Sequence, residues 1–221
     1  MITIMDIDAS QEAVSDYLLA HSAPEDDVLA RLAEETRTTF PDASGMQITA
    51  DEGALLTMLG RLTDARYAVE VGTFTGYSSI CIARGLAEGG RLLACDVSGE
   101  WTAVAQRYWA DAGVADRIEL RLAPATETLA ALPEEATVDL AFVDADKESY
   151  PTYYEELVRR LRPGGVLVLD NVLLGGRVFD EAEQGERVTA MRAVNDRAVA
   201  DDRVDAVMLP LRDGVTVVRR R

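Results

Sequence analysis

The sequence predicts an α/β fold, with a doubly wound, mostly parallel sheet that has helices on both faces and ends in an antiparallel hairpin. Short apolar runs alternate with helical patterns five times between residues 67 and 200. Nearly continuous apolar strands of this kind are typical of parallel sheets that are buried on both faces. The last two apolar runs are separated by only LRDG, which is too short for a parallel crossover, so they form a hairpin.

The pattern therefore gives seven strands. The parallel strands are expected at 67–71, 91–97, 118–123, 138–144 and 166–172, and the hairpin strands at 203–210 and 214–220. Helices are expected after the parallel strands at 76–89, 100–113, 126–132, 153–165 and 185–200. Such an arrangement is Rossmann-like, and we expect its ligand site beyond the carboxyl ends of the parallel strands.

Three helical patterns precede the first strand, at residues 11–21, 24–40 and 51–62. Pro24 and the acidic residues after it suit the first turn of the second helix. No tract of the 221 residues has the composition of a linker, so we expect one domain over 1–221, with amino-terminal helices in 1–62 and a core in 63–221.

The formal net charge of -17 argues against nucleic acid or an anionic membrane as a partner, because both are polyanions. A cationic ligand or a metal suits this charge better. The first residues are acidic where a signal peptide needs basic ones, which predicts a cytoplasmic location. Cys81 and Cys95 are expected as buried thiols, and the sole histidine, His21, as a solvated loop residue. A Ser/His/Asp triad or a histidine metal cage is thereby nearly excluded.

A glycine-containing loop follows the first parallel strand and reads EVGTFTGYSS. Gly72 and Gly76 allow a tight turn and a close approach of ligand to backbone, and Asp96 ends the next strand, where such sheets place an acid for ribose hydroxyls. A dinucleotide site would read G-x-G-x-x-G. Here Glu70 precedes the first glycine, which repels a pyrophosphate but suits S-adenosylmethionine, a cation without phosphate. A turn without any ligand is the alternative.

Acids and an amide also end the fourth and fifth parallel strands. Asp144 and Asp146 follow the fourth, and Asp170 and Asn171 follow the fifth. If these strands are neighbours, Asp144, Asp170 and Asn171 converge as oxygen ligands of a hard divalent cation such as Mg²⁺. The alternative is that these side chains cap helices or are solvated.

Lys147 lies beside these acids and is the only lysine, since the other 21 of the 22 lysine and arginine residues are arginine. Arginine stays protonated, whereas a lysine that is partly desolvated near a cation can act as a base. This favours a catalytic role for Lys147 over a chance surface lysine.

Several segments agree in order and spacing with one family. EVGTFTGYSS, ACDVSGEWTAVAQRYW, AGVADRIELRL, FVDADKESYPTYYE, LRPGGVLVLDNVL and LPLRDGVTVVRR resemble the cation-dependent O-methyltransferases of the caffeoyl-CoA and catechol type, which are class I S-adenosylmethionine-dependent enzymes. The resemblance implies a metal site at Asp144, Asp170 and Asn171 and a catalytic lysine at Lys147. The donor contacts that it implies are Met46, Ile48, Glu70, Gly72, Thr73, Ser78, Asp96, Ala125, Asp144 and Asp146.

The resemblance also implies the reaction, which is methyl transfer to a vicinal-dihydroxy aromatic small molecule that chelates Mg²⁺ or another divalent cation. It further implies a homodimer, with residues 1–62 shaping either the acceptor pocket or the dimer contact. Leu174 and Gly175 depart from the family, where a tryptophan and a polar residue are usual, so we expect a wider and less polar acceptor pocket.

Two other functions fit parts of the sequence. A nicotinamide-dependent dehydrogenase would use Tyr77, Tyr150 or Lys147 as its acid, bind NAD and need no metal. A catalytically silent S-adenosylmethionine-binding protein would bind the donor without turnover, and the change at Leu174 and Gly175 is its only support.

Overall fold

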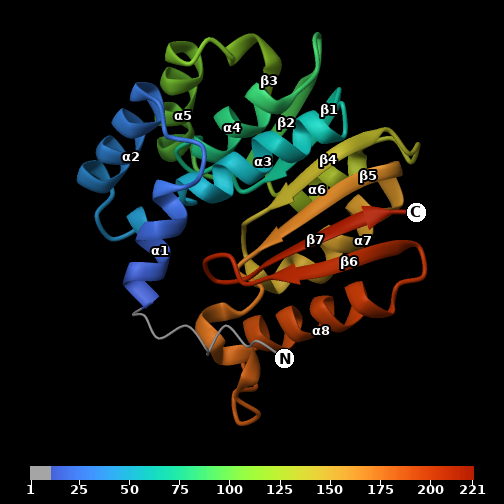
Figure 1. Ribbon diagram of the computed structural model, residues 1–221. Helices are drawn as coiled ribbons and strands as arrows, with labels where there is room; N and C mark the ends of the chain where they lie inside the picture. The colour runs from blue at the N-terminus through green and yellow to red at the C-terminus, as the bar shows by residue number, and fades with distance from the viewer. Residues whose placement is uncertain (1–10) are drawn as a thin grey trace.

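The computed structural model describes residues 11–221 and contains a seven-stranded sheet with the order β3-β2-β1-β4-β5-β7-β6 (Figure 1). The strands are β1 (Tyr67–Val71), β2 (Arg91–Asp96), β3 (Ile118–Leu122), β4 (Val138–Val143), β5 (Leu161–Asp170), β6 (Val204–Leu209) and β7 (Val215–Arg220). Strands β1 to β5 pair in parallel, and β7 pairs antiparallel with β5 and β6. The predicted doubly wound sheet and its carboxyl-terminal hairpin are therefore confirmed. Residues 1–10, on which the prediction about a signal peptide partly rests, lie outside the described residues.

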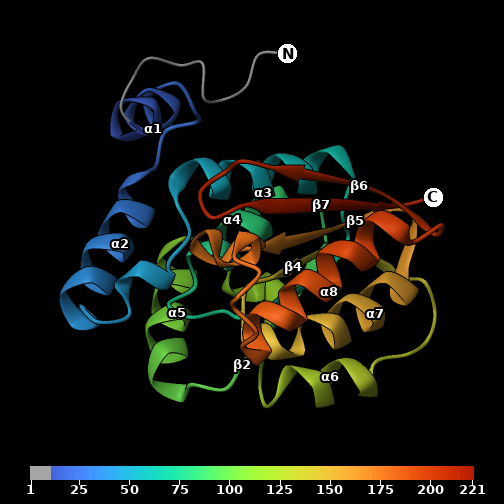
Figure 2. The ribbon, with the colours of Figure 1, turned by 90° about the horizontal axis from the view of Figure 1, so that it is seen from below.

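Helices cover both faces of the sheet. They are α1 (Gln11–Ala20), α2 (Asp27–Thr39), α3 (Ala50–Leu62), α4 (Tyr77–Gly85), α5 (Gly99–Asp111), α6 (Ala125–Ala131), α7 (Tyr150–Arg160) and α8 (Glu186–Ala200). Short 3-10 turns occur at η2 (Ser44–Met46), η3 (Ala115–Arg117), η4 (Lys147–Ser149) and η5 (Leu174–Phe179). Side chains from α6, α7 and α8 form one apolar core, and side chains from α2 to α5 form the other. Figure 2 shows α6, α7 and α8 grouped on one side, with α1 projecting from the body.

Helix boundaries follow local capping. The carboxylate of Asp26 accepts a hydrogen bond from Leu29 N over 3.0 Å, so α2 begins at Asp27 rather than at the predicted Pro24. Ser98 Oγ accepts from Trp101 N over 3.2 Å and starts α5 directly after the loop that follows β2. The loop after β2 is thus held by the first turn of α5.

Strand β5 differs from its prediction at both ends. It begins at Leu161 instead of residue 166, because the RPGG segment continues along β4 through an irregular register, and Gly165 packs against Val138 O. It ends at Asp170 because Asn171 takes a left-handed backbone conformation with φ of 56°. Asp170 is fully buried at the strand end, whereas Asn171 is partly exposed.

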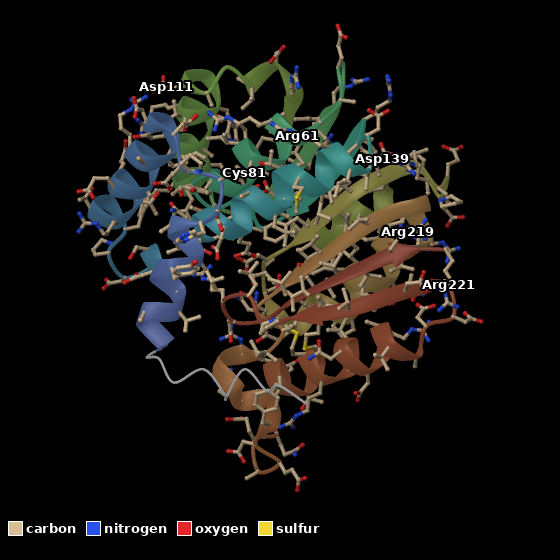
Figure 3. All side chains as sticks on the ribbon, viewed as in Figure 1. Arg61, Cys81, Asp111, Asp139, Arg219 and Arg221 are labelled. Carbon is tan, nitrogen blue, oxygen red and sulfur yellow. The ribbon has the colours of Figure 1, made fainter. Side chains whose placement is uncertain are left out.

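At the end of the sheet where the parallel strands begin, the buried acid Asp139 has a structural role. Asp139 accepts hydrogen bonds from Arg66 N at 2.7 Å and Tyr67 N at 2.8 Å, and it pairs with Arg162. Figure 3 labels Asp139 at this edge, together with Arg219 and Arg221. The carboxyl ends of β4 and β5 point the other way, toward the side on which α1 lies (Figure 1).

The predictions for Cys81, Cys95 and His21 are confirmed. Cys81 and Cys95 are free and buried, and His21 is exposed in a turn. Among residues 11–221, no helix is long and apolar enough to span a membrane.

Candidate active site

A cleft of about 870 Å³ lies at the carboxyl ends of the parallel strands and includes the loop after η2. Eleven of the predicted site residues line it, namely Met46, Ile48, Gly72, Thr73, Ser78, Asp96, Ala125, Asp144, Asp146, Lys147 and Asn171. Two predicted residues, Glu70 and Asp170, lie behind the cleft wall and are fully buried. The topology therefore brings residues from five strand ends to one cavity.

Gly72 brings the ends of β1 and β4 into contact. Its φ is +92°, and a Cβ atom there would lie 1.9 Å from Asp144 O. Asp144 N donates to Val71 O over 2.8 Å, so the two strand ends are also hydrogen-bonded. Only glycine allows this approach, because any other side chain would push Asp144 away from the cleft.

Asp96 holds the glycine loop through its carboxylate. Oδ2 accepts from Thr73 N at 2.9 Å and Phe74 N at 2.8 Å, and Oδ1 accepts from Ser98 N at 2.8 Å. The same side chain lines the cleft. One carboxylate thus fixes two loops and can still present an edge to a ligand.

Glu70 supports the same loop from beneath. Oε2 accepts hydrogen bonds from Ser79 Oγ and, over 3.3 Å, from Thr73 Oγ1, while Oε1 has no donor among the described residues. Complete burial raises the pKa of Glu70 to about 7. Its direct contact with a ligand stays a prediction, because Glu70 acts on the cleft through the loop in this structure.

Asp144, Asp170 and Asn171 meet where β4 and β5 end side by side. Asp170 Oδ1 accepts from Asn171 N over 2.6 Å, whereas the buried Oδ2 has no donor within residues 11–221. Burial and the neighbouring Asp144 raise the pKa of Asp170 to about 7. In the described chain, no three His, Cys, Asp or Glu side chains form a group that could hold a metal ion, and the metal site at Asp144, Asp170 and Asn171 stays a prediction.

Lys147 is held by hydrogen bonds to Asp144 and Tyr150. Its ammonium donates to Asp144 Oδ1 over 2.8 Å and to Tyr150 Oη over 2.7 Å, and it lies 4.6 Å from the centroid of the Tyr150 ring. Tyr150 Oη in turn lies 2.9 Å from Asp170 O. An ammonium has three donors, so two of them orient the side chain and one remains for the cleft that Lys147 lines.

Some lining residues were not anticipated from the sequence. Phe74 and Trp101 line the cleft and pack edge to face, with ring centroids 5.1 Å apart. Their positions in the sequence could have indicated this, because Phe74 lies between the two loop glycines and Trp101 lies in the first turn of α5, shortly after Asp96. Gln47, Arg177 and Arg187 also line the cleft, and none of them was assigned a role from the sequence.

Comparisons with known proteins agree on one family. A family model described as O-methyltransferase matches residues 19–221. The probable caffeoyl-CoA O-methyltransferase 1 of Dictyostelium discoideum is 38% identical over 212 residues, which are 94% of this chain and 92% of that protein. The catechol O-methyltransferase domain-containing protein 1 of Mus musculus is 40% identical over 204 residues, which are 91% of this chain and 77% of that protein.

A solved structure agrees in fold as well as in sequence. The O-methyltransferase TomG from Streptomyces achromogenes, solved in complex with SAM, has a TM-score of 0.87 and 33% identity, covering 96% of this chain and 99% of that one. The chain belongs to the O-methyltransferase family.

Proposed function

We propose that the protein transfers a methyl group from S-adenosylmethionine to one hydroxyl of a vicinal-dihydroxy aromatic small molecule, with the help of a divalent cation. The observation that carries the proposal is the joint position of Lys147, Asp144 and Asn171 along one cleft, with Asp170 just behind them. Family membership, relatives named for caffeoyl-CoA and catechol, and the SAM complex of TomG support it.

The glycine-loop side of the cleft is assigned to the donor. Gly72 and Thr73 offer bare backbone, and Asp96 offers a carboxylate to the ribose hydroxyls. The other proposed donor contacts are Met46, Ile48, Glu70, Ser78, Ala125, Asp144 and Asp146. The acidic lining suits the positive charges of this donor and would repel a pyrophosphate, which also weighs against a dinucleotide.

The chemistry of the donor set fits a divalent cation at Asp144, Asp170 and Asn171. Asp170 has a buried oxygen that no described residue satisfies, and its pKa is raised first by burial and then by the neighbouring charge of Asp144. Two carboxylates and an amide oxygen are hard ligands of the type that Mg²⁺ prefers. Such a cation, when bound, would supply the charge that makes a catechol hydroxyl more acidic.

Lys147 is proposed to take the proton of that hydroxyl. The bond between the acceptor oxygen and the methyl carbon forms as the sulfonium–methyl bond breaks, which leaves a neutral thioether. The hydroxyl proton passes to the neutral amine form of Lys147, which has first given one proton to solvent, and the resulting ammonium later returns a proton to solvent. The hydrogen bonds of Nζ to Asp144 and Tyr150 fix the nitrogen at the cleft, so orientation contributes to the rate.

Leu174 lines the cleft and is 8% exposed, in a turn where Leu174, Gly175 and Gly176 are all left-handed. An apolar side chain at this position supports the proposal of a wide, weakly polar acceptor pocket that admits bulky aromatic acceptors. The single domain, the homodimer and the cytoplasmic location expected from the sequence belong to the same proposal.

The test is methyl transfer from S-adenosylmethionine to a panel of catechols and caffeoyl esters, read by mass spectrometry with Mg²⁺ and with EDTA. We expect a mass gain of one methyl that disappears with EDTA. Product that persists in EDTA would overturn the role of the cation. Donor binding by calorimetry without any product would favour the silent binder, and binding of NAD instead of the donor would favour the dehydrogenase.

A further inference from the structure

Asp146 lines the cleft at the start of the η4 turn, and the turn itself does not use its carboxylate. An aspartate at such a position commonly accepts a hydrogen bond from a backbone N–H of the turn, but Asp146 makes no side-chain cap. Within residues 11–221, its one side-chain hydrogen bond comes from Tyr153 Oη, over 2.6 Å to Oδ1. Oδ2 therefore remains for a ligand in the cleft.

Tyr153, in α7, lines the same cleft and is only 3% exposed. Its phenol is the donor of the bond, because an ionised carboxylate can only accept. Burial, and after it the bond to Asp146, holds the pKa of Tyr153 well above its ordinary value, so the phenol keeps its proton. A short hydrogen bond to a charged acceptor is strong enough to fix the orientation of the Asp146 side chain.

The first turn of α7 holds two consecutive cleft residues through two tyrosines. Tyr150 and Tyr153 are three positions apart and therefore share a face of the helix, with ring centroids 6.3 Å apart and planes inclined at 59°. Tyr150 accepts from Lys147 Nζ, and Tyr153 donates to Asp146. One packed pair of rings thus orients the proposed base and a proposed donor contact.

The neighbouring Tyr154 shows what a purely structural bond of this kind looks like. It is 1% exposed and donates to Asp201 Oδ2 over 3.1 Å. Asp201 also accepts from Arg203 on both oxygens, and neither Tyr154 nor Asp201 lines the cleft. The Tyr154 bond completes a closed ionic network, whereas the Tyr153 bond leaves one oxygen of its acceptor free beside the cleft.

We propose that Tyr153 is a positioning residue, which fixes the Asp146 carboxylate so that Oδ2 accepts a hydrogen bond from an N–H group of S-adenosylmethionine. The inference rests on the proposed function. The donor has two such groups, the exocyclic amine of adenine and the α-ammonium, while its ribose hydroxyls are already assigned to Asp96. An acceptor that is oriented before binding lowers the entropic cost of forming the complex.

The test is calorimetric titration of the full chain with S-adenosylhomocysteine, which keeps both N–H groups. Tyr153→Phe should raise its Kd about 3- to 30-fold, as expected for the loss of a charge-assisted bond that orients the acceptor. The matched control is Tyr154→Phe, which makes the same change one residue away and should alter Kd less than about twofold. Equal losses in the two variants would mean that any buried phenol of α7 has this effect, and would overturn the inference.

Variants of Asp146 test the same bond from its other side. In an Asp146→Ala background, Tyr153→Phe should change Kd less than about twofold, because its acceptor is gone. Asp146→Asn keeps Oδ1 for Tyr153 and places an N–H₂ group where Oδ2 was, so it should bind no more tightly than Asp146→Ala. This outcome does not depend on whether the Tyr153 variant folds. Wild-type affinity in Asp146→Asn would refute the proposed orientation.

Two analogues identify the N–H group. 5′-Methylthioadenosine lacks the α-ammonium, and S-inosylhomocysteine has an oxygen in place of the exocyclic amine. The effect of Tyr153→Phe should disappear for the analogue that lacks the group bound by Asp146, and an equal effect with both analogues would overturn the inference.

The wild type separates this inference from the proposed function. If the wild type binds S-adenosylhomocysteine and Tyr153→Phe binds it equally well, only the role of Tyr153 is overturned. If the wild type shows no saturable binding, the inference and the proposed donor are both overturned.

Discussion

Lys147 Nζ lies 2.8 Å from Asp144 Oδ1, with its side chain only 6% exposed. The two residues are three apart in the sequence, and the η4 turn after β4 brings them together. The proposed base and the first proposed metal ligand therefore form one unit. A cation at Asp144 would weaken the hold of that carboxylate on the ammonium and leave Nζ freer to exchange protons with the acceptor.

Replacement of Lys147 should separate proton acceptance from positive charge. Lys147→Ala should lower kcat by about 10² to 10⁴ while the Kd for S-adenosylmethionine stays near that of the wild type. Lys147→Arg should be nearly as slow, because a guanidinium keeps its charge and does not give up its proton. Steady-state kinetics measures kcat of each variant, and calorimetry measures its Kd for S-adenosylmethionine. An arginine variant with most of the wild-type kcat would show that charge alone suffices.

Asp96 should matter for both stability and donor binding. Asp96→Ala leaves the backbone amides of Thr73, Phe74 and Ser98 without their acceptor. Each buried amide that loses its acceptor should lower the free energy of unfolding by about 1–3 kcal/mol. Because the loop loses its anchor, donor affinity should fall more than about tenfold.

The control for Asp96 is Asp111→Ala, at the outer surface in Figure 3, which removes an equal charge and an exposed ion pair with Arg31. It should cost less than about 1 kcal/mol and leave donor affinity unchanged. Urea denaturation and calorimetry compare the two variants. Equal losses in both would mean that Asp96 acts only through its charge.

Substitutions at Gly72 and Gly89 distinguish the cost of a left-handed backbone from the cost of a clash between an added Cβ atom and a neighbouring strand. Both have positive φ, +92° and +72°, but only at Gly72 would an added Cβ meet another atom, Asp144 O. Gly89→Ala should cost about 1–2 kcal/mol of unfolding free energy and keep activity. Gly72→Ala should cost more than about 4 kcal/mol and abolish methyl transfer, because it displaces the end of β4. Similar losses in the two variants would contradict the importance of the contact.

Glu70 should make stability depend on pH. Burial raises its pKa from 4.5 to about 7, so the unfolded chain releases this proton at lower pH than the folded protein does. The stability contribution of the protonated group is complete below the unfolded pKa and is lost as pH rises through about 7. Between pH 4.5 and about 7, the free energy of unfolding of the wild type should therefore fall by on the order of 3 kcal/mol relative to that of Glu70→Gln. Urea denaturation over a pH series measures the difference, and a difference that does not vary with pH would refute the assignment.

Much of the fold was predictable because its signals are local. The apolar runs of β1 to β4 and the short LRDG connection are properties of neighbouring residues, and these elements were predicted nearly to their ends. The ends of β5 were wrong. They depend on the contact of Gly165 with Val138 and on the left-handed Asn171, and neither is visible in a hydrophobic pattern.

By itself, the sequence determined which polar residues follow the strands. Parallel strands align their carboxyl ends, so Gly72, Asp96, Asp144 and Asn171 were expected along one cleft, and they line it. Only the tertiary structure decided which acids face the cleft and which lie behind it. Asp170 is buried because β5 lies between β4 and β7 in the sheet, and this burial depends on contacts between distant strands that no local pattern records.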